Sequence, residues 1–286
     1  MRARLGSVDV GEALPVVVMG VINVSPESFH PGSVFRGEAA VVHAAQGMVD
    51  AGAELIDVGG RSTAPYLPTE ISELEETERL VRAVGALAAK LSVPVSADTT
   101  RPAVARAALE AGARVVNDVS ALAEPALARE AAAHDASLIV MASLGAGGAG
   151  LSETGRGEGP IGVVRRILQD ALARARAAGL PDERVVLDPG IGFFRDAGVP
   201  WHVWDVTVLA GLPALADLGR PLCVGVSRKS FIGAVTGRER PEDRLAGSLA
   251  ATAIAVLGGA ALVRTHDVRE TVDAVRLAER VRKAAR

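Results

Sequence analysis

The sequence predicts a (β/α)8 barrel, a closed ring of parallel strands in which a helix follows each strand. Short apolar runs alternate with longer helical patterns along nearly the whole chain, and the connections between them are short. Alternation of this kind is typical of a parallel sheet with right-handed crossovers. Eight such units within 286 residues fit the length of a closed barrel.

The predicted strands share one form, an apolar run that stops at a polar residue, glycine or proline. Val185–Asp188 is the clearest of them, because three apolar residues run into a carboxylate and Pro189-Gly190 then breaks the pattern. In chain order, the eight predicted strands are Val16–Val24, Glu54–Val58, Val93–Ala97, Arg114–Val116, Ser137–Met141, Val185–Asp188, Pro221–Val226 and Ala261–Val263.

The predicted helices lie between these strands and carry recognisable start signals. Glutamates gather near the start of the second helix, where the helix dipole favours anions, and Pro102 suits the first turn of the third. The eight predicted helices are Glu38–Ala51, Ile71–Leu91, Pro102–Ala111, Pro125–His134, Ile161–Ala178, Trp201–Leu218, Arg244–Leu257 and Val268–Ala284. The glycine-rich stretch Gly145–Gly159 is predicted to be a loop at a strand end.

No linker divides the chain, so residues 1–286 are expected to form a single domain. A doubly wound open sheet is the alternative architecture. Its usual dinucleotide-binding signature, Gly-x-Gly-x-x-Gly after the first strand, is absent from this sequence. The barrel is therefore the preferred interpretation.

The composition is that of an ordinary globular protein and argues against several classes of partner. The formal net charge is −3 and only 3% of residues are aromatic, which does not favour nucleic-acid binding. The single cysteine, Cys223, lies in an apolar run, so a buried thiol and a reducing cytoplasm are expected. No secretory signal is recognised at the amino terminus. Ala246–Val263 is uncharged, but its small residues and central glycines favour a helix followed by a strand over a membrane segment.

Polar and charged residues stand at the carboxyl ends of the predicted strands, where (β/α)8 barrels place their active sites. A purely structural barrel has little reason to gather so many charges on one rim, since buried charges must be paired or solvated. Any single member could instead serve as a cap or a turn residue. The set consists of Asn23, Asp57, Asp98, Asn117, Asp188, Lys229, Arg264 and His266.

Two subsets have chemistry that can be interpreted. Asp98, Asn117, Asp188 and Lys229 together offer acceptors, an amide and donors, which suits a flat heterocycle with N–H and C=O groups along its edge.

The second subset could hold a phosphate or pyrophosphate. Arg264 and His266 are two residues apart and share one face of an extended strand, and Ser62-Thr63 follows the second strand. The alternative for Arg264 is an ion pair with Asp267 or Asp243. The five histidines are scattered, and no pair has metal-ligand spacing, so a zinc site is not expected.

At this point the motifs, taken together and in order, resemble those of the dihydropteroate synthase family. The resemblance extends from about Val16 to the last helix. It implies a (β/α)8 barrel, usually a homodimer, that makes 7,8-dihydropteroate in folate synthesis from 6-hydroxymethyl-7,8-dihydropterin pyrophosphate and 4-aminobenzoate with the help of Mg²⁺. The motifs are Met19–Phe29, Asp57–Thr63, Asn117–Val119, Asp188–Phe193, Ser227–Gly233 and Arg264–Val268.

The resemblance also implies roles for single residues. Asp98, Asn117, Asp188 and Lys229 would bind the pterin. Asn23, Thr63, Arg264 and His266 would hold the pyrophosphate, with Asn23 also touching Mg²⁺, and Thr63, Phe193 and Ser230 would border the aminobenzoate. Of these, Asp98, Asp188, Lys229, Arg264 and His266 would take part in catalysis by stabilising the leaving pyrophosphate and the pterin cation.

The sequence departs from the usual family pattern in its loops. In the second loop Arg61 stands where the family usually has Glu, and Ala64 and Tyr66 replace Arg and Gly. The other departures are Glu27–Ser33 in the first loop, Ala142 in place of His, and Phe194-Arg195 in place of Gly-Lys.

These departures leave two alternatives open. One is a paralogue that binds a pterin with little or no synthase activity. The other is a pterin-dependent methyltransferase, which the pyrophosphate-binding motifs disfavour because methyl transfer releases no pyrophosphate.

Overall fold

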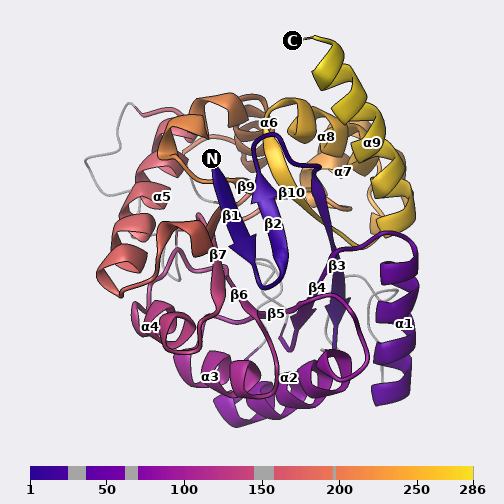
Figure 1. Cartoon of the computed structure of the whole chain (residues 1–286). Coiled ribbons are helices and arrows are strands. Elements are labelled where there is room, and N and C mark those ends of the chain that lie inside the picture. Colours follow the sequence, from indigo (N-terminus) through magenta and orange to yellow (C-terminus); the bar gives the residue numbers. More distant parts are fainter. Residues whose placement is uncertain (25–36, 62–69, 145–157, 196–197, 286) are drawn as a thin grey trace.

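The computed structural model describes residues 1–24, 37–61, 70–144, 158–195 and 198–285. Eight of its strands close into a barrel in the order β10-β3-β4-β5-β6-β7-β8-β9, and every neighbouring pair is parallel (Figure 1). The predicted barrel is confirmed, and the open sheet is excluded. The barrel strands are β3 (Val17–Asn23), β4 (Leu55–Gly59), β5 (Val95–Asp98), β6 (Val115–Asp118), β7 (Ser137–Met141), β8 (Val185–Asp188), β9 (Leu222–Gly225) and β10 (Ala260–Thr265).

The helices surround the barrel and follow the predicted order with small shifts at their ends. They are α1 (Glu38–Asp50), α2 (Glu73–Ala88), α3 (Pro102–Glu110), α4 (Ala126–Ala133), α5 (Pro160–Ala177), α6 (Trp201–Ala210), α7 (Ser230–Thr236), α8 (Leu245–Leu257) and α9 (Val268–Ala284). The predicted helix Trp201–Leu218 is wrong in its second half. Gly211 ends α6, and a 3₁₀ helix, η5 (Leu212–Leu218), follows with Pro213 in its first turn, because proline cannot continue an α-helical hydrogen-bond ladder. The short helix α7 was not predicted.

A hairpin that sequence analysis did not predict covers the amino-terminal end of the barrel. Strands β1 (Arg2–Leu5) and β2 (Val8–Gly11) pair antiparallel, and the hairpin lies across the barrel opening in Figure 1. Leu5 and Val10 are fully buried in one cluster with the inward side chains of the barrel. The hydroxyl of Ser137 donates to the carbonyl of Arg4 at 2.6 Å. The hairpin therefore seals the end opposite to the strand carboxyl ends.

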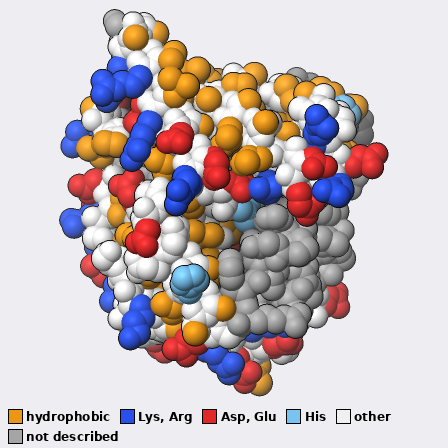
Figure 2. Space-filling view, turned by 90° about the vertical axis from the view of Figure 1, so that its right-hand side faces the viewer, with side chains coloured by type: hydrophobic (Ala, Val, Ile, Leu, Met, Phe, Trp, Pro, Cys, Tyr) orange, Lys and Arg blue, Asp and Glu red, His pale blue; other side chains and the backbone are white. Residues whose placement is uncertain are grey.

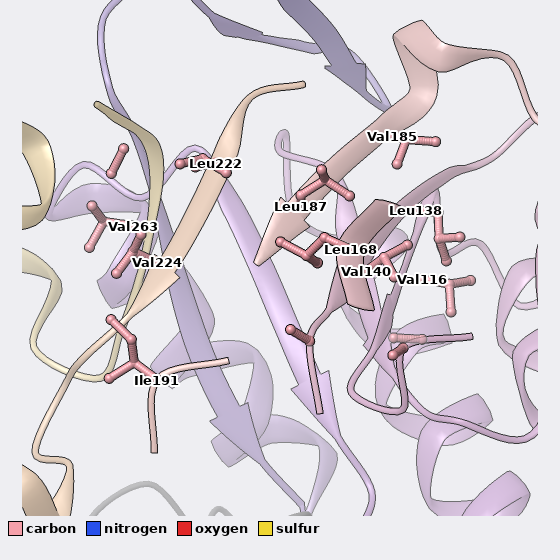
Figure 3. Packing of buried hydrophobic residues seen from close by; sticks show 14 of the residues in the cluster. Val116, Leu138, Val140, Leu168, Val185, Leu187, Ile191, Leu222, Val224 and Val263 are labelled. Carbon is pink, nitrogen blue, oxygen red and sulfur yellow. The ribbon is translucent and has the colours of Figure 1, made fainter. Parts of the chain in front are cut away.

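Side chains alternate along each barrel strand between the helices and the barrel interior. Val185 and Leu187 of β8 face outward and belong to the cluster that includes Leu168 of α5 (Figure 3). Val186 faces inward with the fully buried Cys223, as expected for a buried thiol. The inward residues of the other strands include Met19, Leu55, Val115, Ile139 and Leu262. Because side chains alternate, the residues two positions further along four of these strands also face inward. They are Asp57, Asn117, Asp188 and Arg264.

Among the described residues no helix is long and apolar enough to cross a membrane. The uncharged stretch Ala246–Val263 is divided between α8 and β10, as sequence analysis predicts.

Replacing Leu5 by Ala should destabilise the protein by about 2–5 kcal/mol, because it opens a cavity in the cluster that joins the hairpin to the barrel interior. The free energy of unfolding, measured by urea denaturation, tests this. Leu74→Ala is the matched control, since Leu74 is 69% exposed and its truncation should change stability by no more than about 0.5 kcal/mol. Equal effects of the two substitutions would contradict the sealing role of the hairpin.

Candidate active site

An arginine and two aspartates from three different strands meet inside the carboxyl-terminal rim of the barrel. Arg264 of β10 donates from Nε to Asp57 Oδ2 of β4 at 2.7 Å, and from Nη2 to Asp98 Oδ2 of β5 at 3.0 Å. Asn117 of β6 donates from Nδ2 to the same Asp57 oxygen at 3.1 Å. The inward parity of the strands thus brings together four residues that lie up to 207 positions apart in the sequence.

The contacts of Arg264 differ from the ion pair considered for it in sequence analysis. Its partners are Asp57 and Asp98, whereas Asp267 forms a two-bond ion pair with Arg228 at 2.6 and 2.8 Å. His266 approaches the Ser227 hydroxyl through Nδ1 at 3.0 Å, and its own backbone N–H donates to the same oxygen at 3.2 Å. The loop after β9 and the end of β10 are therefore tied together at two points.

Burial changes the protonation equilibria of this cluster. Burial and the neighbouring Asp57 carboxylate raise the pKa of Asp98 to about 7, although Arg264 pulls in the opposite direction. Burial disfavours the Arg264 cation, but Asp57 and Asp98 outweigh it and hold the pKa of the guanidinium above its ordinary value. One oxygen of Asp57 and one of Asp98 are buried without a hydrogen-bond partner among the described residues. Such orphaned acceptors cost stability and are typical of functional sites.

Asp188 and Lys229 form a second group on the same rim. Asp188 closes β8 and accepts a hydrogen bond from the N–H of Gly190 at 2.8 Å. Burial raises its pKa, and the nearby Lys229 ammonium works against that shift. Lys229 donates to the carbonyl of Ile191, and burial lowers its pKa to about 8 while Asp188 draws it back up. A buried acid and a buried base with shifted pKa values, side by side in one rim, are typical of a functional site.

The loop that follows Asp188 is shaped by its glycines. Gly190 has φ of 72°, and a Cβ at this position would lie 1.9 Å from the carbonyl oxygen of Ala142, so no side chain fits there. The next turn brings the Phe193 ring to 4.7 Å from the Lys229 ammonium. Phe194, which departs from the family pattern, stacks on Trp204 of α6 with a ring-centroid distance of 4.8 Å.

The other predicted residues lie near this loop or on β3. Ser230, at the start of α7, accepts a hydrogen bond from Arg195 Nη2 at 2.8 Å, and the Arg195 guanidinium lies 4.4 Å above the Trp201 ring. Asn23 ends β3, beside Gly59. Thr63 lies outside the described residues, as do Ala64, Tyr66 and all of the first-loop departures, Glu27–Ser33.

The departure at Arg61 has a partner that sequence analysis did not identify. Arg61 Nε lies 3.4 Å from Oε2 of Glu76, a fully buried residue of α2, and Arg101 contacts the same oxygen at 3.0 Å. Thr99, next to Asp98, donates to the other Glu76 oxygen at 2.7 Å. The positive charge of Arg61 also opposes the rise in the pKa of Asp98.

Sequence analysis missed several residues that shape the site. Asp57 was recognised at the rim but received no role, although it binds both Arg264 and Asn117. Ser227 lies inside a recognised motif, and its contact with His266 could have been suspected because both follow neighbouring strands. Asp205 carries no such signal, since it lies within the helix α6, away from any strand end.

Comparison with known proteins agrees with this geometry. The family model of pterin-binding enzymes matches residues 19–266. The dihydropteroate synthase of Synechocystis sp. is 41% identical over 92% of this chain and 89% of its own. A Xanthomonas albilineans dihydropteroate synthase solved with 4-aminobenzoic acid is 36% identical, with a TM-score of 0.84 over 98% of this chain and 97% of that one.

The same Xanthomonas enzyme has been solved in complex with 7,8-dihydropteroate. This structure is 34% identical to the present chain, with a TM-score of 0.81 over 98% of both chains. The chain therefore belongs to the dihydropteroate synthase family of pterin-binding enzymes.

Proposed function

We propose that this chain condenses 6-hydroxymethyl-7,8-dihydropterin pyrophosphate with 4-aminobenzoate, giving 7,8-dihydropteroate and pyrophosphate. It is a transferase, like its relatives. The observation that carries the proposal is the meeting of two buried ionic groups on one rim, Arg264 with Asp57 and Asp98, and Asp188 with Lys229. Together they offer hydrogen-bond acceptors and donors in one buried site, as binding of the polar edge of a heterocycle requires.

The pterin is assigned to Asp98, Asn117, Asp188 and Lys229. A buried carboxylate such as Asp188 accepts from the amino and ring N–H groups of a pterin, while Lys229 donates to its carbonyl or ring nitrogens. Asn117 is already oriented by Asp57. Because these groups lie on or directly beside strand ends, the ring is held by the rigid part of the molecule.

The reaction breaks the bond between the pterin methylene carbon and the pyrophosphate oxygen, and the electron pair leaves with the pyrophosphate. The amine nitrogen of 4-aminobenzoate then forms the new bond to that carbon and loses a proton. The site must stabilise a leaving anion and a delocalised pterin cation. Arg264 and His266 serve the first, and the carboxylates of Asp98 and Asp188 serve the second.

His266 is prepared to donate to the pyrophosphate. The Ser227 oxygen accepts from the backbone N–H of His266, so its own hydroxyl proton is available for Nδ1 of the same ring. A neutral imidazole that accepts at Nδ1 carries its proton on Nε2, where it can donate to a phosphate oxygen. Asn23, Thr63 and Arg264 complete the proposed pyrophosphate site, and Thr63, Phe193 and Ser230 border the aminobenzoate.

Turnover tests the proposal directly. The purified protein with Mg²⁺, the pterin pyrophosphate and 4-aminobenzoate should release pyrophosphate, measured by a coupled phosphate assay.

Asp188→Ala should weaken binding of the pterin pyrophosphate by about 100-fold, because it leaves buried donors of the ring unpaired. Asp182→Asn, a surface acid paired with Arg176, is the matched control and should bind normally. Pterin binding without turnover would show that the chain is a binding paralogue.

We propose that Mg²⁺ is held mainly by the substrate. Among the described residues, no group of three or more His, Cys, Asp or Glu side chains could hold a metal ion. One oxygen donor on the rim is the amide oxygen of Asn23, which lies close to Gly59, where an added Cβ would be 3.2 Å away. Mg²⁺ commonly combines one or two protein oxygens with substrate phosphates, so this donor fits. The bound ion would neutralise the charge that the leaving pyrophosphate acquires.

Removing Mg²⁺ should lower the affinity for the pterin pyrophosphate by about tenfold and leave the affinity for the pterin alcohol unchanged. Isothermal titration calorimetry with and without EDTA measures both. Asn23→Ala should reduce this Mg²⁺ effect. An equal Mg²⁺ effect on the two ligands would place the ion elsewhere.

We also propose a homodimer formed by the face of α6 to α9. Exposed large hydrophobic side chains gather on these helices, and Figure 2 shows such side chains over the upper part of the molecule. Exposed large apolar side chains on several adjacent helices support an interface on this face. The residues are Val203, Val206, Val235, Ile254, Leu257, Leu277 and Val281.

Ile254→Asp should shift the sedimentation coefficient from that of a dimer to that of a monomer, because it buries an unpaired charge in the interface. Leu74→Asp on α2, at a residue that is 69% exposed and lies away from this face, is the control and should leave the dimer intact. A wild-type protein that sediments as a monomer at micromolar concentration would contradict the proposal.

We place the protein in the cytoplasm. The support is its single cysteine, which is fully buried and unpaired, as is usual in a reducing compartment. Recovery of the native protein in any fraction other than the cytosolic one after cell fractionation would contradict this.

A further inference from the structure

Asp205 is a buried carboxylate that the proposed reaction does not use. It lies on α6 and is 1% exposed. Its Oδ1 accepts a hydrogen bond from the backbone N–H of Gly192 at 2.7 Å, and its Oδ2 is buried without a hydrogen-bond partner among the described residues. An acid in this position costs stability, and its loop contact alone could be made by a neutral amide.

The loop that Asp205 holds is the loop on which Lys229 rests. Ile191 accepts a hydrogen bond from the Lys229 ammonium, and the Phe193 ring lies 4.7 Å below it. A Cβ on Gly192 would lie 2.8 Å from Cδ and 3.3 Å from Nζ of Lys229. An added Cβ on the residue that donates to Asp205 would therefore touch the lysine, so Asp205 and Lys229 contact the same short loop.

Other titratable groups also lie around this pair, and Asp188 acts on the pKa of Lys229 more strongly than Asp205 does. Around Lys229 these are Asp188 on β8, Arg264 on β10 and the Cys223 thiol on β9. Around Asp205 they are Arg195 and His202, of which Arg195 lies over Trp201 and donates to Ser230. Burial raises the pKa of Asp205, and Lys229 opposes this shift more strongly than the other two cations. Lys229 is thus the main cation that faces Asp205.

We propose that Asp205 is a positioning residue for Lys229, a permanent counter-ion that holds the charged lysine against the Gly190–Phe194 loop while Asp188 binds the substrate. Two carboxylates face one lysine, and only Asp188 stands at the end of a barrel strand. When the N–H groups of a pterin bind Asp188, they share its negative charge. Asp205 remains beneath the loop and keeps Lys229 ionised for donation to the ring. This inference rests on the proposed placement of the pterin.

The isosteric variant Asp205→Asn tests the role of the charge. Asparagine keeps an oxygen for the Gly192 N–H, so folding and the melting temperature should be preserved. Because kcat/KM reports the ionisation of the free enzyme, it should fall in the wild type as the pH rises through about 8, the pKa of Lys229. Removing a negative charge makes the ammonium easier to deprotonate, so this alkaline limb should move to lower pH by roughly one unit.

Asp182→Asn is the matched control, because it removes one negative charge from an exposed ion pair far from Lys229. Its alkaline limb should coincide with that of the wild type. An Asp205→Asn enzyme with an unmoved limb, whether or not its melting temperature falls, would overturn the proposal and leave Asp205 with a merely structural role. An equal shift in both variants would also overturn it, since the effect would then follow the net charge.

A double-mutant cycle tests the coupling without any substrate. Urea unfolding at pH 7 of the wild type, Asp205→Asn, Lys229→Met and the double variant should show a favourable coupling of about tenfold in the unfolding equilibrium constant. Additive effects would overturn the pairing. If the wild type shows this coupling but no turnover, the proposed reaction fails while the Asp205–Lys229 pair stands.

Discussion

The guanidinium of Arg264 fixes the relative positions of three strand ends, and the active site depends on it. It extends inward from β10 past β3 to Asp57 on β4 and Asp98 on β5. Removing one partner from such a buried network typically costs about 3–5 kcal/mol, because the remaining charges stay buried and unpaired. The strands can therefore shift little against each other at this rim. Asn117, held by Asp57, takes its orientation from the same network.

The rim is built for binding at the expense of stability. Asp57 and Asp98 each keep one buried oxygen without a partner among the described residues, and the pKa of Asp98 is raised to about 7. At the opposite end of the barrel the hairpin contributes Leu5, Val10 and other apolar side chains to a buried apolar cluster. A ligand that satisfies the rim acceptors would stabilise the folded state by mass action. One end of the barrel thus contributes mainly to stability, and the other end carries the polar residues of the site.

The sequence predicts the parts of this structure that depend on local pattern. Strand β7 and helix α9 agree with their predicted limits, and the inward parity of the strands accounts for the meeting of Asp57, Asn117, Asp188 and Arg264. The hairpin β1–β2 was missed because Arg2, Arg4 and Asp9 interrupt its apolar residues, so that neither strand forms an apolar run. Asp205 and the Arg61–Glu76 pair were missed for a different reason. Their partners come from other elements, and a helix pattern does not reveal which buried acid meets which cation.

Two departures from the family pattern within the described residues, Arg61 and Phe194, are compensated by new contacts. Arg61 replaces the family's usual Glu, but it pairs with the buried Glu76, which also receives Thr99 and Arg101. Phe194 replaces a glycine and finds Trp204 as a stacking partner, directly beside the residue that holds the loop through Gly192. The first change is thereby linked to the residue that follows Asp98, and the second packs the loop that Lys229 contacts. The similarity to dihydropteroate synthases over most of the chain, including one solved with 7,8-dihydropteroate, favours the synthase over a binding paralogue.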